Sequence, residues 1–292
     1  NNTALGTIAG GVTVASGAAL ELSGGITIGA EALTLNNAGV SSGGALRNIS
    51  GNNTYQGAIT LSTNAVRINS DSGTLTLSGN ITNSTLGLTV GGVGDTSISG
   101  IIGNGAGTLT KDGTGTLTLS GANTYSGGTT ISNGVVKAGI APVGSITSGA
   151  FGTGSVTVSS GGAIDLNTYT VANTLSLSGT GYSSSGALYN SHASTGATAS
   201  GNITLAADTT IKNSGSGTLT LSGTINGAQA LTITNTGSVT LSGIVGGSTS
   251  LTSLSISGPS TLGANVTTSG TQTYSGSVTL SGGDRTLTGS TI

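Results

Sequence analysis

The sequence of 292 residues contains no cysteine, no methionine and no tryptophan, and only one histidine, one phenylalanine and two prolines. Without cysteine, the chain can form neither a disulfide nor a thiolate metal site. His192 is the single histidine, so a metal site with several histidine ligands is excluded and a Ser-His-Asp triad could use only this residue. We therefore expect no cofactor and no catalytic residue.

Charged side chains and long apolar runs are also scarce. Charged residues make up 5% of the chain, and the formal net charge is −2. Such a chain has no electrostatic reason to bind nucleic acid or an anionic membrane. No apolar run is long enough to cross a bilayer as a helix, so we expect no membrane insertion by this segment. Because it starts at Asn1 without methionine or an apolar leader, we interpret it as a mature segment or part of a longer protein.

Glycine, by contrast, occupies 55 positions, a composition that can indicate a flexible linker. Two observations argue against a linker here. Hydrophobic residues make up 34% of the chain, and the mean hydropathy is +0.24. They also alternate with polar residues, as where Leu117 and Leu119 are separated by Thr118. Alternation places the leucines on one face of a strand, so we predict an ordered all-β chain.

A short strand ending in Ser-Gly recurs nine times, with its closing glycine at positions 24, 79, 100, 121, 179, 223, 243, 258 and 282. Consecutive closing glycines lie 20 or 21 residues apart at several places, which is a spacing typical of stacked solenoid coils. Repeated Ser-Gly, Asn-Gly and Gly-Gly pairs are expected to supply the positive φ angles that tight corners require.

The sequence also repeats over a longer distance. Residues 12–14 and 19–22 match residues 156–158 and 163–166 at an offset of 144, and residues 73–79 match residues 217–223 at the same offset. Residues 44–48 match residues 186–190 at an offset of 142. We therefore predict that residues 1–292 form a single β-solenoid made of two tandem super-repeats, about 1–144 and 145–292.

Short strands of period two cannot bury their apolar face alone, whereas stacked coils bury a continuous core. The chain is accordingly predicted to be a right-handed parallel β-helix of about 14 coils of about 20 residues each. The alternative is a sandwich or barrel of antiparallel hairpins. It ranks second, because hairpin proteins do not usually return to the same turn every 20–21 residues.

One stretch identifies a family. From Leu109 to Gly134 the chain reads L-x-K-x-G-x-G-T-L-T-L-S-G-x-N-T-Y-x-G-x-T-x-I-x-x-G, and partial copies lie at residues 52–57 and 271–276. This motif resembles the autotransporter-associated β-strand repeat of Gram-negative passenger domains and giant surface adhesins. Val136 departs from it, since the family usually has leucine there. The resemblance implies a right-handed parallel β-helix exported to the bacterial cell surface, with no catalytic residue.

The carboxylates offer one candidate metal site. Asp71, Asp95 and Asp112 are spaced by about one coil each, so they could stack along one edge as a calcium site. The competing and favoured interpretation is solvated corner residues, helped by Lys111 beside Asp112. Glu21 and Asp165 lie between apolar neighbours and are expected to face outward, too many coils apart to act together.

Hydroxyl and aromatic side chains offer a candidate ligand-binding face. Outward Thr-x-Thr pairs suggest a threonine lattice, repeated from coil to coil, that could bind ice or glycans. Tyrosines recur in Thr-Tyr-x-Gly corners, either as exposed aromatic contacts for sugars or packed within a turn. The threonines are Thr74, Thr76, Thr116, Thr118, Thr218 and Thr220, and the tyrosines are Tyr55, Tyr125 and Tyr274.

The even repeat without a recognisable site favours a structural role, as a stalk or filament-forming segment of a secreted, extracellular adhesin-like protein. The expected partner is the protein itself, through head-to-tail stacking or continuation of the solenoid, because both ends of a rod expose unpaired strand edges. The alternative is a ligand-binding solenoid face for glycans or ice, with host or matrix glycans as partners. A polysaccharide-active enzyme comes third, by analogy of fold alone.

Overall fold

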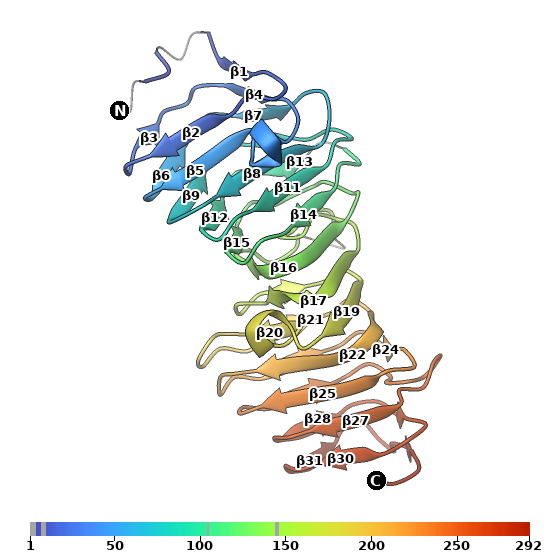
Figure 1. Ribbon diagram of the computed structural model, residues 1–292. Helices are drawn as coiled ribbons and strands as arrows, with labels where there is room; N and C mark the ends of the chain where they lie inside the picture. The colour runs from blue at the N-terminus through green and yellow to red at the C-terminus, as the bar shows by residue number, and fades with distance from the viewer. Residues whose placement is uncertain (1–3, 7–9, 104, 144–145) are drawn as a thin grey trace. The chain divides into compact units, whose positions relative to one another are not determined.

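The structure is a computed structural model that describes residues 4–6, 10–103, 105–143 and 146–292 (Figure 1). The chain divides into two compact units, Asn1–Gly154 and Ser155–Ile292. The expected super-repeat boundary at residues 144–145 lies outside the described residues. Whether the two units form one continuous solenoid stays a prediction.

Unit 1 contains strands β1 (Val12–Val14), β2 (Leu20–Ser23), β3 (Thr27–Ile28), β4 (Leu33–Leu35), β5 (Leu46–Ser50), β6 (Asn53–Tyr55), β7 (Ile59–Leu61), β8 (Val66–Ser70), β9 (Thr74–Leu77), β10 (Ile81–Thr82), β11 (Leu88–Gly91), β12 (Asp95–Ile98), β13 (Ile102–Gly103), β14 (Leu109–Lys111), β15 (Thr116–Leu119) and β16 (Thr129–Ala138). It also contains the 3₁₀ turn η1 (Val40–Ser42).

Unit 2 contains strands β17 (Val156–Asp165), β18 (Thr170–Val171), β19 (Leu175–Gly179), β20 (Leu188–Asn190), β21 (Ala197–Ala199), β22 (Ile203–Asn213), β23 (Leu219–Leu221), β24 (Ile225–Asn226), β25 (Ala230–Asn235), β26 (Val239–Leu241), β27 (Ser253–Ile256), β28 (Ser260–Leu262), β29 (Val266–Thr267), β30 (Gln272–Tyr274), β31 (Val278–Leu280) and β32 (Leu287–Thr288). It also contains the 3₁₀ turn η2 (Tyr182–Ser184).

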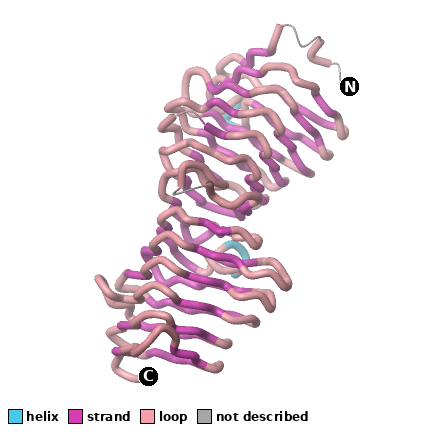
Figure 2. The backbone as a smooth tube through the Cα atoms, turned by 180° about the vertical axis from the view of Figure 1, so that it is seen from behind, coloured by secondary structure: helices cyan, strands magenta, loops and turns pink. Residues whose placement is uncertain are grey.

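Successive strands of unit 1 belong to three ladders in turn, so one coil contributes one strand to each ladder (Figure 2). The first ladder is β1-β4-β7-β10-β13, the second is β2-β5-β8-β11-β14-β16, and the third is β3-β6-β9-β12-β15-β16. All of these pairings are parallel, which confirms the solenoid and rules out the antiparallel sandwich.

Unit 2 repeats this arrangement. Its first ladder is β17-β19-β22-β24, continued through Val245 to β29-β32, and its second is β17-β20-β22-β25-β27-β30. Its third ladder is β18-β21-β23-β26-β28-β31. No helix in the described parts of the chain is both long enough and apolar enough to span a membrane.

The solenoid has about 12 turns, fewer than the 14 expected, because several coils are longer than 20 residues. The pairing of Leu20 with Leu46 takes 26 residues, and that of Ile164 with Leu188 takes 24. Each of these two coils accommodates a 3₁₀ turn, η1 or η2, inserted at the corresponding place. The insertions lengthen a coil without shifting its inward face.

The inward positions form vertical columns of stacked side chains. In the second ladder of unit 1, Leu46, Ile68, Val90, Lys111 and Ile131 lie above one another. All five are buried, with exposed fractions of 2% or less. Strand spacing places equivalent atoms about 4.8 Å apart, close enough for continuous van der Waals contact. The predicted aliphatic core is therefore confirmed, with one lysine inside it.

Most glycines that close the Ser-Gly corners do not have the positive φ angle that was expected of them. The closing glycines at positions 79, 100, 121, 223, 243 and 258 are absent from the positive-φ positions; only those at 24, 179 and 282 have positive φ. A Cβ atom on any of those six would lie 1.9–2.3 Å from a backbone oxygen of the coil beside it. Glycine is needed at these corners because successive backbones approach too closely for a side chain.

A threonine inside an apolar column provides a test of this packing. Thr96 pairs with Leu75 and Leu117 in the third ladder, is 3% exposed, and its hydroxyl has no partner among the described residues. Valine has the same shape without the unpaired hydroxyl. Thr96→Val should therefore raise the free energy of unfolding by about 1 kcal/mol, measured by chemical denaturation. A loss of stability would show that the hydroxyl is hydrogen-bonded.

Candidate functional site

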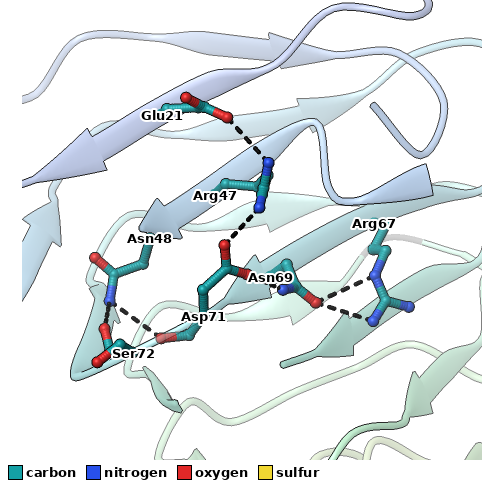
Figure 3. A network of polar contacts seen from close by, with 8 residues as sticks. Glu21, Arg47, Asn48, Arg67, Asn69, Asp71 and Ser72 are labelled. Carbon is teal, nitrogen blue, oxygen red and sulfur yellow. Dashed lines mark hydrogen bonds and ion pairs between the residues drawn. The ribbon is translucent and has the colours of Figure 1, made fainter. Parts of the chain in front are cut away.

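Charged side chains of unit 1 concentrate on the outward side of its second ladder, in an arrangement that we call the charged column (Figure 3). One residue per coil occupies the same register position: Glu21 on β2, Arg47 on β5, Asn69 on β8 and Gly91 on β11. Asp112 directly follows β14 and continues the column. Arg67 and Asp71, from the coil of Asn69, complete it.

Ion pairs connect the residues of this column across coils. Arg47 donates from Nη1 to Glu21 Oε1 at 3.0 Å and from Nη2 to Asp71 Oδ2 at 2.5 Å. Arg67 binds Asp112 with both terminal nitrogens, at 2.7 Å and 2.9 Å, and also donates to Asn69 Oδ1. The two arginines are therefore linked through Asn69, whose amide donates to Asp71.

Gly91 is what allows Arg67 to reach Asp112, two coils away. A Cβ atom at Gly91 would lie 2.1 Å from Arg67 Nη2 and 2.2 Å from Asp112 Oδ1. The side chains of Arg67 and Asp112 are 21% and 36% exposed, so solvent screens their attraction. Each pair contributes on the order of 0.5 kcal/mol. The charged column therefore joins the coils and leaves no carboxylate free for catalysis at this place.

The calcium candidates do not come together. Asp71 and Asp112 bind different arginines, and Asp95 accepts a hydrogen bond from the backbone N–H of Thr116 at 2.7 Å. Within the described ranges, no group of three or more acidic or histidine side chains is placed to hold a metal ion. The observed roles are ion pairing and capping of the backbone.

The expectation that Asp165 faces solvent is wrong. Glu21 is exposed, but Asp165 is only 2% exposed. Its carboxylate accepts hydrogen bonds from the backbone N–H of Asn167 and from both the backbone N–H and the hydroxyl of Ser191. The loop that follows β20 therefore folds over it, which alternation along one strand cannot reveal.

His192 lies in the same loop, next to Ser191. Its Nδ1 accepts hydrogen bonds from the backbone N–H groups of Ser194 and Thr195, at 3.3 Å and 3.0 Å. The hydroxyl of Ser191 instead donates to Asp165, at 2.7 Å. Serine, histidine and aspartate are thus neighbours without the serine-to-histidine hydrogen bond that a triad needs.

Unit 2 carries a matching outward column, in which Asp165, Tyr189 and Lys212 occupy successive coils of its second ladder. Burial, with a further contribution from the Asp165 charge, raises the pKa of Tyr189. The two columns occupy equivalent positions in the two units. The sequence alone showed no sign of the roles of Arg47 and Arg67 in the unit 1 column, because their partners lie 24 to 45 residues away.

The predicted threonine lattice is interrupted in unit 1. Thr76 and Thr118 do share a column, but Ser97 separates them, and Asp95 separates Thr74 from Thr116 in the same way. Thr218 and Thr220 belong to unit 2, where Thr218 precedes β23 and only Thr220 lies in a strand. The two named pairs of unit 1 therefore do not lie on adjacent coils. Thr220 pairs with Thr198 and Thr240 in the coils on either side of it, so a threonine face in unit 2 stays a prediction.

Two of the three tyrosines are unavailable for stacking on a sugar. Tyr55 and Tyr125 have an exposed fraction of 0%, and their hydroxyls bind Glu31 O at 2.9 Å and Thr129 Oγ1 at 2.6 Å. Burial, with a smaller effect of the Glu31 charge, raises the pKa of Tyr55 to about 12. Tyr274 is partly exposed and donates to Gln272 Oε1. The motif tyrosines thus pack inside corners.

Lys111 is the most unusual member of the motif, because it occupies an inward position. Its side chain is 2% exposed, and Nζ donates to the carbonyl oxygens of Asp112, Gly113 and Asn133 at 2.8, 2.7 and 3.4 Å. Lysine therefore closes a corner by donating hydrogen bonds to backbone carbonyl oxygens of two successive coils. It does not serve as a solvated counter-ion for Asp112.

Burial lowers the pKa of Lys111 from 10.5 to about 8, although the charges of Asp112 and Asp95 oppose this and Arg67 adds to it. Between pH 8 and pH 10.5 the unfolded chain therefore holds more protons than the folded chain, so this residue makes stability rise with pH. We expect the free energy of unfolding to increase by about 2 kcal/mol from pH 7.5 to pH 9.5. Lys111→Met should abolish the increase; an unchanged pH profile in that variant would contradict the assignment.

The comparison with protein families gives one result. Residues 109–138 match the family described as the passenger-associated-transport-repeat, over the stretch that contains Lys111, Asn123 and Tyr125. No curated protein and no solved structure matches the chain. The matched segment runs from β14 through β16, so the family motif coincides with more than one full coil of the parallel solenoid. Residues 109–138 are a passenger-associated transport repeat, and the chain that contains them is a parallel β-solenoid.

Proposed function

We propose that this chain is a structural segment of a passenger exported to the bacterial cell surface, acting as a stalk or filament-forming solenoid rather than as an enzyme. The repeat family implies secretion to the cell surface. The repeated geometry of the coils supports a scaffold. Apolar columns lie inside, and carboxylates such as Asp71 and Asp95 are engaged in ion pairs or backbone capping outside.

The observation that carries the proposal is the coil containing β31. Val278 and Leu280 continue the inward columns of Ser260 and Leu262, yet they are 38% and 51% exposed. Among the described strands, β31 pairs only with β28. A further coil, either from the same chain or from another copy, would cover these side chains and satisfy the open edge.

Association through this coil can be tested by sedimentation velocity over rising protein concentration. We expect the unmodified chain to form larger species as concentration rises, because near-zero net charge leaves little repulsion between copies. The double variant Val278→Asp/Leu280→Asp should remain monomeric. Val93→Asp, at a valine that is 75% exposed in unit 1, is the matched control and should associate normally. An unmodified chain that is monomeric at every concentration would overturn the proposal.

A further inference from the structure

A shallow hollow lies on the first ladder of each unit, and these two hollows occupy corresponding positions. The hollow of unit 1 has a volume of about 180 Å³ and that of unit 2 about 350 Å³. The lining residues are Asn80, Ile81, Thr82, Ile101, Gly103 and Thr124 in unit 1, and Thr224, Asn226, Ile244, Gly247 and Ser248 in unit 2. Thr224 and Asn226 follow Asn80 and Thr82 by 144 residues, and Ile244 follows Ile101 by 143.

Both hollows have an isoleucine as the apolar wall. Ile101 and Ile244 are 41% and 47% exposed, in a protein whose other aliphatic side chains mostly form the core. Each follows a Ser-Gly corner directly, and each stands beside a glycine whose missing side chain lets a neighbouring side chain approach closely. A Cβ atom at Gly103 would lie 2.3 Å from Thr124 Oγ1, and one at Gly247 would lie 2.6 Å from Ile244 Cγ2.

Both hollows also hold an asparagine whose side-chain oxygen is fixed. Asn80 Oδ1 accepts the backbone N–H of Ile101 at 2.9 Å. Asn226 Oδ1 accepts the backbone N–H groups of Ser248 and Thr249, at 3.0 Å and 3.3 Å. These bonds orient each amide while its two N–H groups remain available as donors. Each asparagine has a threonine two residues away in the sequence. The order is Asn80 then Thr82 in unit 1, and Thr224 then Asn226 in unit 2.

The chemistry of the lining selects the ligand. No charged residue lines either hollow, so an acidic or basic ligand would lose its hydration without gaining a partner. One isoleucine offers too little apolar surface to bind a lipid chain, but it can pack against the C–H face of a sugar ring. The amide and the hydroxyls suit the sugar's own hydroxyl groups. The volumes admit a single ring rather than a long oligosaccharide.

We infer that each hollow is a binding site for one neutral sugar residue, such as a terminal hexose or 6-deoxyhexose of a surface glycan. A ligand of this size in a shallow site binds in the millimolar range. This inference does not depend on the proposed structural role, because neither hollow involves β31.

The experiment is saturation-transfer NMR on the full chain with methyl glycosides of neutral hexoses and 6-deoxyhexoses, compared with a uronic acid. We expect transfer to at least one neutral glycoside and none to the uronic acid. Ile101→Ser/Ile244→Ser should reduce the transfer at least fivefold, with each single variant retaining about half. Because both isoleucines are partly exposed, these variants should fold, which circular dichroism would verify.

Val93→Ser, which removes an exposed valine away from both hollows, is the control and should leave transfer unchanged. A second route is Gly103→Val, whose Cβ would lie 2.3 Å from Thr124 Oγ1 and would displace that lining side chain of the unit 1 hollow. It should halve the transfer in a protein that circular dichroism shows to be folded. Absence of transfer to every neutral glycoside, equal transfer to the uronic acid, or full transfer in the double isoleucine variant would each overturn the inference. None of these outcomes bears on the sedimentation result.

Discussion

Replacing Gly100 by alanine is expected to lower the free energy of unfolding by about 3 kcal/mol, at the upper end of the cost of overpacking. The added Cβ would lie 1.9 Å from the carbonyl oxygen of Gly79 in the neighbouring coil. That oxygen belongs to the backbone, so it cannot move aside as a flexible side chain could. Because Gly121 makes the same approach to Gly100, a shift of one corner would also disturb the next.

Chemical denaturation followed by circular dichroism measures this effect. Gly29→Ala is the matched control, since Gly29 also lies in unit 1, has no positive φ, and has no atom within 4 Å of an added Cβ. It should change stability by less than about 0.5 kcal/mol. Equal effects of the two substitutions would mean that the corner glycines matter for chain flexibility and not for close approach between coils.

Tyr125→Ala is expected to cost about 4 kcal/mol, because it empties the largest side-chain space in the corner of the transport repeat. The ring is fully buried, and its hydroxyl is bonded to Thr129 Oγ1. Residues after β16 close over it: a Cβ atom at Gly152 would lie 2.9 Å from the ring, and Thr153 donates its backbone N–H to Tyr125 O. Removing the ring therefore also loosens this returning segment.

Tyr125→Phe separates the two contributions, since it keeps the ring and removes only the hydroxyl. We expect a loss of about 1 kcal/mol, because the hydroxyl of Thr129 still reaches the carbonyl oxygen of Phe151 at 3.3 Å. Both variants can be measured by denaturant unfolding. If phenylalanine cost as much as alanine, the hydrogen bond and not the packing of the ring would hold the corner.

Alternation along single strands was sufficient to predict the core. Leu117 and Leu119 are both buried, as their spacing indicated, and Thr118 between them is only partly so. The motif around Lys111 also identified the repeat family before any coordinates were known. These features depend on neighbours in the sequence, and a period of two is the same in every parallel coil.

Interactions between coils could not be predicted in the same way. Arg67 meets Asp112 across 45 residues, and Asp165 is covered by Ser191 from 26 residues further on. These pairings depend on the length of each coil, which the insertions η1 and η2 change. They also depend on gaps such as Gly91, whose missing side chain admits a guanidinium group.

The amino-acid sequence by itself determined the all-β class, the inward columns and the family of residues 109–138, because each follows from local periodicity or from a contiguous motif. The tertiary structure alone decided which residues share an outward column, why Ser-Gly corners need glycine, and where Ile101 and Ile244 stand open beside a polar pair. The physical reason is register. Stacking brings together residues that are about one coil apart, and because the coils differ in length, the sequence alone does not show which residues will pair.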